Sequence, residues 1–176
     1  MLKGDKIYLR RVETYDATTI LFWENNTHNW RVSNTEIPFS LHEIEAFIDN
    51  AQAYRSTGQL RLMIVDNASN KSVGCLDFFE MNFKELRAGV GILINDTADR
   101  GKGFAKESLG LAEDYVKKVF NFRQLFCNIQ ADNTESIALF EKLGYQKQGI
   151  KKDWYKVDGA YIDEYFYQKR FELNEE

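Results

Sequence analysis

Residues 92–105 read Ile92-Leu93-Ile94-Asn95-Asp96-Thr97-Ala98-Asp99-Arg100-Gly101-Lys102-Gly103-Phe104-Ala105, an apolar strand followed by a polar connection and a glycine-punctuated helix start. The first N–H groups of a helix lack partners within the helix, and the helix dipole adds positive potential at the same place. A phosphate or pyrophosphate group binds readily there. Gly101 and Gly103 allow a ligand to lie against the main chain because they have no Cβ, and Arg100 adds a fixed positive charge.

The spacing of the glycines argues against two other nucleotide-binding turns. A dinucleotide-binding turn follows its strand directly and uses a third glycine, whereas here residues 95–100 intervene and the third position is Lys106. A P-loop closes with Gly-Lys-Ser/Thr, which this segment lacks. A helix start that binds no ligand remains an open alternative on this turn alone.

The length and composition predict one globular domain spanning residues 1–176. The chain is long enough to bury a sizeable core, and 44% of its residues are hydrophobic and 14% aromatic. Its net charge of −4 disfavours a nucleic-acid partner and permits a cationic substrate.

The cysteines and the N-terminal segment favour a cytoplasmic protein. Cys75 and Cys127 lie far apart in apolar runs, which is typical of buried, reduced thiols. With only His28 and His42 and no Cys/His cluster, no metal site is expected. The N-terminal residues contain no apolar stretch of signal or membrane-spanning length, so no membrane association is expected either.

Hydrophobic periodicity predicts an alternation of strands and helices. Strands are expected at 7–12, 59–65, 72–80, 87–94, 124–130, 145–155 and 161–169. Helices are expected from a cap at Thr14 or Asp16 to about residue 25, from 41 to 51, from 104 to 120, and through Phe140, with an irregular loop over 25–39. Ser40 with Glu43 and Asp132 with Glu135 have the spacing of capping boxes, and Asp158-Gly159 indicates a hairpin turn.

Two motifs resemble the GNAT acyl-CoA N-acyltransferases. Residues 100–105 match the family's R/Q-x-x-G-x-G/A pyrophosphate signature, and residues 133–145 resemble its N-x-x-S/A-x-x-L-[YF]-x-K-x-G-[FY] segment. The order strand, two helices, three strands, helix, strand, helix, two strands is similar to the GNAT fold. That resemblance implies an α/β protein with a mixed, mostly antiparallel central sheet flanked by helices. Residues 8–13 and Asp16 resemble the branches that acetylate spermidine and the N-terminal amines of ribosomal proteins.

The resemblance implies acetyl-CoA as cosubstrate and assigns its binding residues. In the family, the strand before the loop polarises the thioester, the loop binds the pyrophosphate, and the helix after the next strand lies along the pantetheine. The matching positions are Ile92, Leu93, Ile94, Arg100, Gly101, Lys102, Gly103, Phe104, Ala105, Asn133 and Ser136.

Two catalytic positions of the family are altered in this chain. An alkylamine of pKa ~10 is only about one part in a thousand neutral at pH 7, a cost of roughly 4 kcal/mol that a base would partly recover. The family's frequent glutamate base corresponds to Gly89, and its tyrosine acid corresponds to Phe140. Glu80 is the first substitute base and Asp77 the second. They lie on opposite faces of a regular strand, so both could serve only with a bulge, and both also fit solvated surface acids.

These observations predict direct transfer of an acetyl group to a primary amine, without a covalent enzyme intermediate. A polyamine or another small amine is the expected acceptor, and a peptide N-terminus is the alternative. Because Gly89 and Phe140 replace the family's catalytic residues, a non-catalytic acyl-CoA-binding module is a further alternative. An exposed strand edge or hairpin near the C-terminus would allow a homo-oligomer.

Overall fold

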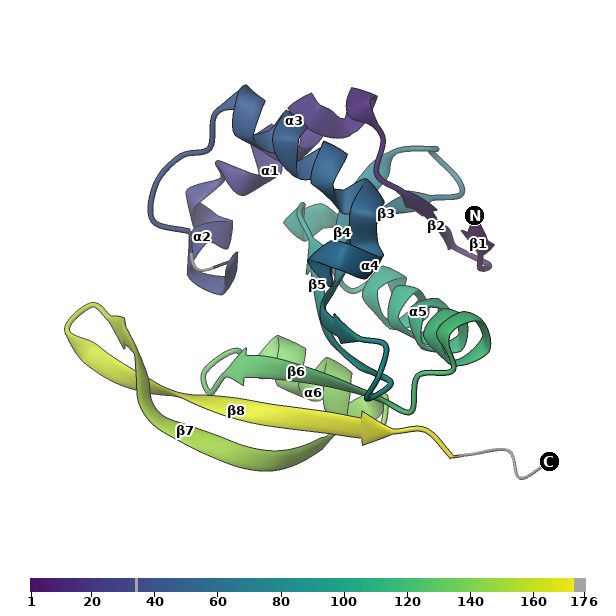
Figure 1. The fold of residues 1–176 in the computed structure, drawn as a ribbon. Coiled ribbons are helices and arrows are strands. Elements are labelled where there is room, and N and C mark those ends of the chain that lie inside the picture. Colours follow the sequence, from purple (N-terminus) through teal and green to yellow (C-terminus); the bar gives the residue numbers. More distant parts are fainter. Residues whose placement is uncertain (34, 173–176) are drawn as a thin grey trace.

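One eight-stranded sheet runs through the computed structural model, which describes residues 1–33 and 35–172. The strands follow the order β1-β2-β3-β4-β5-β6-β8-β7 (Figure 1). Only β5 and β6 pair in parallel among them. The strands are β1 (Leu2–Lys3), β2 (Ile7–Arg11), β3 (Leu60–Asp66), β4 (Ser72–Asn82), β5 (Arg87–Ile94), β6 (Gln124–Gln130), β7 (Gln146–Val157) and β8 (Ala160–Arg170).

Helices cover both faces of this sheet. The α-helices are α1 (Ala17–Glu24), α2 (Thr27–Ser33), α3 (Leu41–Asn50), α4 (Tyr54–Thr57), α5 (Phe104–Phe120) and α6 (Thr134–Lys142). The short 3-10 helices are η1 (Thr14–Asp16), η2 (Ala51–Ala53) and η3 (Thr97–Asp99). No helix in the described part of the chain is long and apolar enough to cross a membrane.

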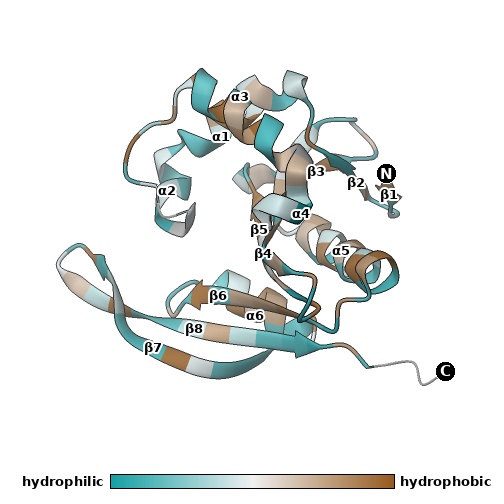
Figure 2. Ribbon diagram, in the orientation of Figure 1, coloured by the Kyte–Doolittle hydropathy of each residue, from teal (hydrophilic) through white to brown (hydrophobic). Residues whose placement is uncertain are grey.

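Alternation along the central strands divides the core between the two faces. On β3, Leu62 and Ile64 pack with α5 and α6, whereas Met63 and Val65 pack with α1 and α3. Both sets are buried, which is typical of a central strand covered on each side. In Figure 2 the central strands β4 and β5 carry hydrophobic segments, whereas α2 is largely hydrophilic.

The expected α/β architecture with a mixed, mostly antiparallel sheet is confirmed, and so are the long elements. The capping box at Ser40 is also confirmed. The Ser40 hydroxyl accepts from the Glu43 N–H at 3.3 Å, and the Glu43 carboxylate accepts from the Ser40 N–H at 2.7 Å. This pair fixes the start of α3.

Two local expectations are wrong. The loop expected over 25–39 contains α2, whose start is fixed by the Asn26 side chain accepting from the His28 N–H at 3.1 Å. The second capping box is also shifted by one residue. Asn133 is the N-cap of α6 and accepts from the Ser136 N–H at 3.2 Å. Asp132 instead forms an ion pair with Arg31 of α2.

The parallel strands β5 and β6 diverge soon after they pair. Their register covers Arg87 to Gly89 against Gln124 to Phe126, although β5 continues to Ile94 and β6 to Gln130 (Figure 1). Backbone groups on the facing edges of the diverging segments can therefore reach a ligand.

Candidate active site

The glycine loop has the backbone conformation that its sequence suggests. Gly101 and Gly103 have φ angles of +75° and +88°, in the left-handed region that favours glycine. Gly103 is the N-cap of α5, a helix of 17 residues, so the helix dipole is directed at the loop. A Cβ on Gly101 would meet nothing within 4 Å, so the loop surface there is open to a ligand.

Lys6 and Lys102 tie the loop to its surroundings, and a third cation, Arg100, lines its open side. The Lys6 ammonium donates to the carbonyl of Lys102 at 2.8 Å, and the Lys102 ammonium donates to Asp99 at 2.6 Å. Lys102 does not line the cavity beside the loop, although the sequence assigned it to the cofactor. Arg100 lines that cavity and is 44% exposed, with its Nε donating to the Ile94 carbonyl at 3.4 Å.

A large cavity of about 750 Å³ runs from the loop to the start of α6. This volume lies in the range of small-molecule and cofactor sites. All the cofactor-binding residues assigned from the sequence line it except Lys102: Ile92, Leu93, Ile94, Arg100, Gly101, Gly103, Phe104, Ala105, Asn133 and Ser136. The helix α2 adds His28, Asn29 and Arg31, which the sequence reading placed in a loop.

A smaller cavity of about 230 Å³ lies where β5 and β6 diverge. Residues 90–93 of β5 and residues 127–130 of β6 line it. It adjoins the large cavity, because Ile92, Leu93 and Asn133 line both. Its other end, on the α1 side of the sheet, is built from Glu24, Arg61, Cys75 and Asp77.

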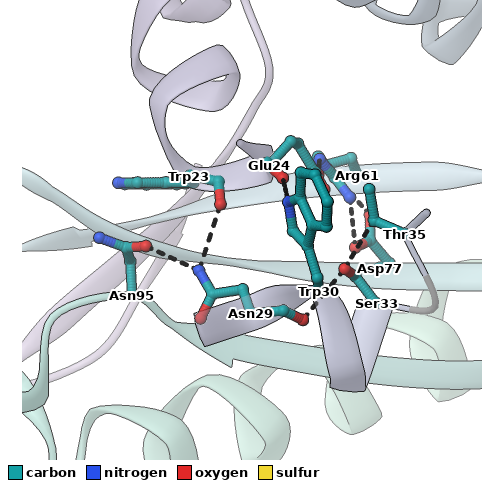
Figure 3. A network of polar contacts seen from close by, with 9 residues as sticks. All are labelled: Trp23, Glu24, Asn29, Trp30, Ser33, Thr35, Arg61, Asp77 and Asn95. Carbon is teal, nitrogen blue, oxygen red and sulfur yellow. Dashed lines mark hydrogen bonds and ion pairs between the residues drawn. The ribbon is translucent and has the colours of Figure 1, made fainter. Parts of the chain in front are cut away.

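Glu24, Arg61 and Asp77 form an ion-pair triad at this end (Figure 3). The Arg61 guanidinium donates to Glu24 at 2.7 Å and to both oxygens of Asp77 at 2.7 and 2.9 Å. Burial lowers the pKa of Arg61, but the charges of Asp77 and Glu24 outweigh burial and raise it well above its usual value. Two carboxylates and one guanidinium leave the triad with one net negative charge.

The helix α2 is held over the cavities by buried polar contacts (Figure 3). The Asn29 amide donates to the Trp23 carbonyl at 3.2 Å and to the Asn95 side chain at 3.0 Å, and Asn29 is only 3% exposed. The Trp30 indole donates to the Glu24 carbonyl at 2.8 Å, and the Ser33 hydroxyl donates to the Asn29 carbonyl at 3.0 Å. These contacts fix one wall of both cavities.

Neither of the family's catalytic positions carries a proton-transfer group here. A Cβ on Gly89 would overlap the ring of Phe79, which packs edge-on against Phe126 at 5.7 Å. A glutamate at position 89 would therefore require the Phe79 ring to move. Phe140 lines the small cavity, is 3% exposed, and packs edge-on against Tyr145 at 4.9 Å.

The two substitute bases lie in different surroundings. The expectation that Glu80 faces the cleft is corrected. Glu80 is exposed and lines neither cavity, because it lies at the register shift between Phe79 and Asn82, with a φ of +48°. Asp77 does line the small cavity, but both of its oxygens already accept hydrogen bonds from Arg61.

Two thiols and one phenol are among the side chains of the small cavity that were not assigned to it from the sequence. Cys75 and Cys127 are buried, as predicted, and burial raises the pKa of each thiol to about 12. Neither thiol is therefore activated as a nucleophile. The third residue is Tyr155 of β7, whose hydroxyl donates to Glu164. No group of three or more His, Cys, Asp or Glu side chains is placed to hold a metal ion in the described segments.

Comparison with known proteins identifies the family. Residues 6–146 match the family described as acetyltransferase (GNAT) domain, so the chain belongs to the GNAT acetyltransferases. The fold is confirmed by a solved structure of spermidine N-acetyltransferase from Vibrio cholerae in complex with CoA and spermine. That structure has a TM-score of 0.85 at 22% identity and covers 95% of this chain and 96% of that one.

Two curated relatives align along nearly the whole chain. The spermidine N(1)-acetyltransferase of Vibrio cholerae is 25% identical over 165 residues, covering 91% of this chain and 90% of that protein. The ribosomal protein uS5-alanine N-acetyltransferase of Escherichia coli is 31% identical over 180 residues, covering 92% and 86%. The chain is thus a GNAT N-acetyltransferase.

Proposed function

We propose that the enzyme transfers the acetyl group of acetyl-CoA directly to a primary amine of a polyamine or another small amine. One observation carries this proposal. The cavity beside the glycine loop adjoins, through the diverging strands, a smaller cavity that ends at the negatively charged Glu24–Arg61–Asp77 triad. An anionic end attracts a cationic acceptor and favours a second ammonium group on it.

The large cavity supports a bound acyl-CoA. The open loop at Gly101 and the N-terminus of α5 suit a pyrophosphate, and Arg100 lies at the same end. Asn133 and Ser136 suit the pantetheine arm of the cofactor, which would run from the loop toward the diverging strands. A thioester at the small cavity would lie beside the β5 backbone, whose N–H groups suit a developing negative charge on oxygen.

Direct transfer also agrees with the side chains of the small cavity. The raised pKa values of Cys75 and Cys127 argue against an acetyl-cysteine intermediate. A neutral amine held beside the thioester can attack it without an enzyme nucleophile. Binding both reactants in one site makes their reaction effectively unimolecular.

Transfer to a peptide N-terminus is a second candidate. The Escherichia coli relative named for an alanine N-acetyltransferase has the higher identity of the two curated relatives. A peptide α-amine has pKa ~8, so its deprotonation costs less than that of an alkylamine.

Acetyl-CoA turnover, followed as free-thiol release, tests both candidates. Spermidine, spermine and a peptide beginning with alanine serve as acceptors at equal concentration. We expect kcat/KM to be highest with a polyamine. A higher kcat/KM with the peptide would assign the enzyme to N-termini, and no thiol release with any of these amines would contradict the proposed function.

A further inference from the structure

The small cavity needs a proton acceptor that the expected residues do not supply. The Phe79 ring fills the space beside Gly89, and Glu80 lies outside the cavity. Both oxygens of Asp77 accept from the Arg61 guanidinium, which does not release its protons and so cannot relay one. An alkylamine arrives mostly as an ammonium ion, so at least one proton must leave before nitrogen can attack the thioester.

A buried carboxylate lies next to one residue of the cavity lining, Tyr155. Glu164 of β8 is only 3% exposed, and its side chain accepts from the Tyr155 hydroxyl and from the Lys151 ammonium. Glu164 lies opposite Gln130 in the β6–β8 register, and Gln130 lines both cavities. Tyr155 itself lines the small cavity, so it stands between this carboxylate and the acceptor space.

A bulge in β7 holds Tyr155 in this position. The register shifts between Lys151 and Tyr155, and Asp153 within the shift has a φ of +51°. Asp163 fixes the bulge by accepting from the Asp153 N–H at 3.0 Å and from the Lys152 ammonium at 2.7 Å. Bulges of this kind commonly re-aim a side chain beside an active site.

The polarity of the hydrogen bond determines what Tyr155 can do. A phenol has one O–H, and here that O–H donates to Glu164. The lone pairs of the same oxygen are left to accept a proton from a group in the cavity. Burial and the bond to Glu164 raise the pKa of Tyr155 to about 12, so the residue is a neutral relay rather than a phenolate.

We propose that Tyr155 and Glu164 together accept the proton of the substrate ammonium. The N–H bond of the ammonium breaks as its proton passes to Tyr155 Oη, and the proton of Tyr155 passes to Glu164. The neutral amine then attacks the thioester carbon, and the carbon–sulfur bond breaks. The second proton leaves the new amide nitrogen for the CoA thiolate, and Glu164 returns the first proton to water. This inference rests on the proposed acetyl transfer and assigns Tyr155 and Glu164 as the residues that take the proton from the ammonium group.

The experiment compares Tyr155→Phe with wild type on two acceptors, an alkylamine of pKa ~10 and an α-amine of pKa ~8. We expect the variant to lower kcat/KM for the alkylamine about 100-fold at pH 7, the usual size of a general-base contribution, and to lower it much less for the α-amine. The wild-type alkylamine profile should be flat between pH 7 and 9, whereas the variant should rise about tenfold per pH unit because only free amine reacts.

Two further variants make the result decisive. Tyr161→Phe removes the hydroxyl of an exposed tyrosine from the same hairpin and should match wild type on both acceptors. Glu164→Gln retains a side chain of similar shape and should reproduce the altered pH profile of Tyr155→Phe, with little further loss in the double variant.

Three outcomes would overturn the inference. An unchanged pH profile in Tyr155→Phe would show that the residue transfers no proton. Equal losses on the two amines would assign it a role in packing alone. Wild type that releases no thiol with either amine would overturn the inference together with the proposed function. If Glu164→Gln does not fold, Tyr155→Phe still decides, because it removes a single oxygen atom.

Discussion

Single residues determine which groups are available for chemistry in the small cavity. The glycine at position 89 leaves room for the Phe79 ring, and the arginine at position 61 takes up both oxygens of Asp77. The sequence alone indicated that a base was missing at Gly89, because the family motif located the position. It gave no signal for Tyr155, since the β7 bulge that places this side chain depends on contacts with Asp163 of the neighbouring strand.

A matched pair of glycine substitutions tests the packing at position 89. A Cβ on Gly89 would overlap the Phe79 ring, whereas a Cβ on Gly91 would lie 4.0 Å from it. We expect Gly89→Ala to lower the free energy of unfolding by about 1–3 kcal/mol through overpacking, and Gly91→Ala to change it little. Urea denaturation of both variants measures the difference. Equal free energies of unfolding for the two variants would show that the Phe79 ring moves aside without cost.

A charge substitution tests the anionic end of the small cavity. Glu24→Gln removes one carboxylate from the triad while keeping a hydrogen-bond acceptor for Arg61. We expect the KM for spermidine to rise about tenfold, which is roughly 1.4 kcal/mol of lost attraction, and the KM for acetyl-CoA to stay constant. Glu45→Gln, an exposed acid on α3, serves as the control. If neither variant changes the KM for spermidine, the ammonium groups of spermidine do not bind at the triad.

At the level of elements, the predictable parts were those with local signals. The capping box of Ser40 and Glu43, the hairpin turn at residues 158–159 and the apolar periodicity of α5 all act between near neighbours in sequence. The helix α2 has one such local contact at its start, in which the Asn26 side chain accepts from the His28 N–H. It is held by Asn29, which reaches Asn95 on the loop after β5, so only the folded chain defines it.

Removing the Asn29 amide should loosen α2 and both cavities together. Asn29→Ala leaves a buried carbonyl at Trp23 and a side-chain oxygen at Asn95 without this donor, a cost of about 1–3 kcal/mol. We expect a lower melting temperature and a higher KM for both substrates. Asn50→Ala, an exposed asparagine on α3, should change neither quantity. Loss of stability with both KM values unchanged would show that α2 is not a wall of the site.

At the scale of the whole molecule, the proposed function depends on the gap where two neighbouring strands of the sheet diverge. The motifs predicted that the glycine loop and the start of α6 share a ligand, and the structure places both on one cavity. The small cavity, which we propose for the acceptor, adjoins the large one where β5 and β6 stop pairing after Gly89. Hydrophobic periodicity does not reveal where two paired strands separate. The sequence could therefore indicate the cofactor but not the shape of the cavity proposed for the acceptor.

A thermal-shift titration with acetyl-CoA tests the central claim most directly. Wild type should gain stability with concentration, about 2.7 kcal/mol at one hundred times Kd. Gly103→Glu, which puts an anion at the start of α5, should show no gain. Gly159→Glu, at a hairpin glycine with a similar φ of +84°, should respond as wild type does. A wild type that acetyl-CoA does not stabilise, or a Gly103→Glu variant that it stabilises equally, would contradict the account.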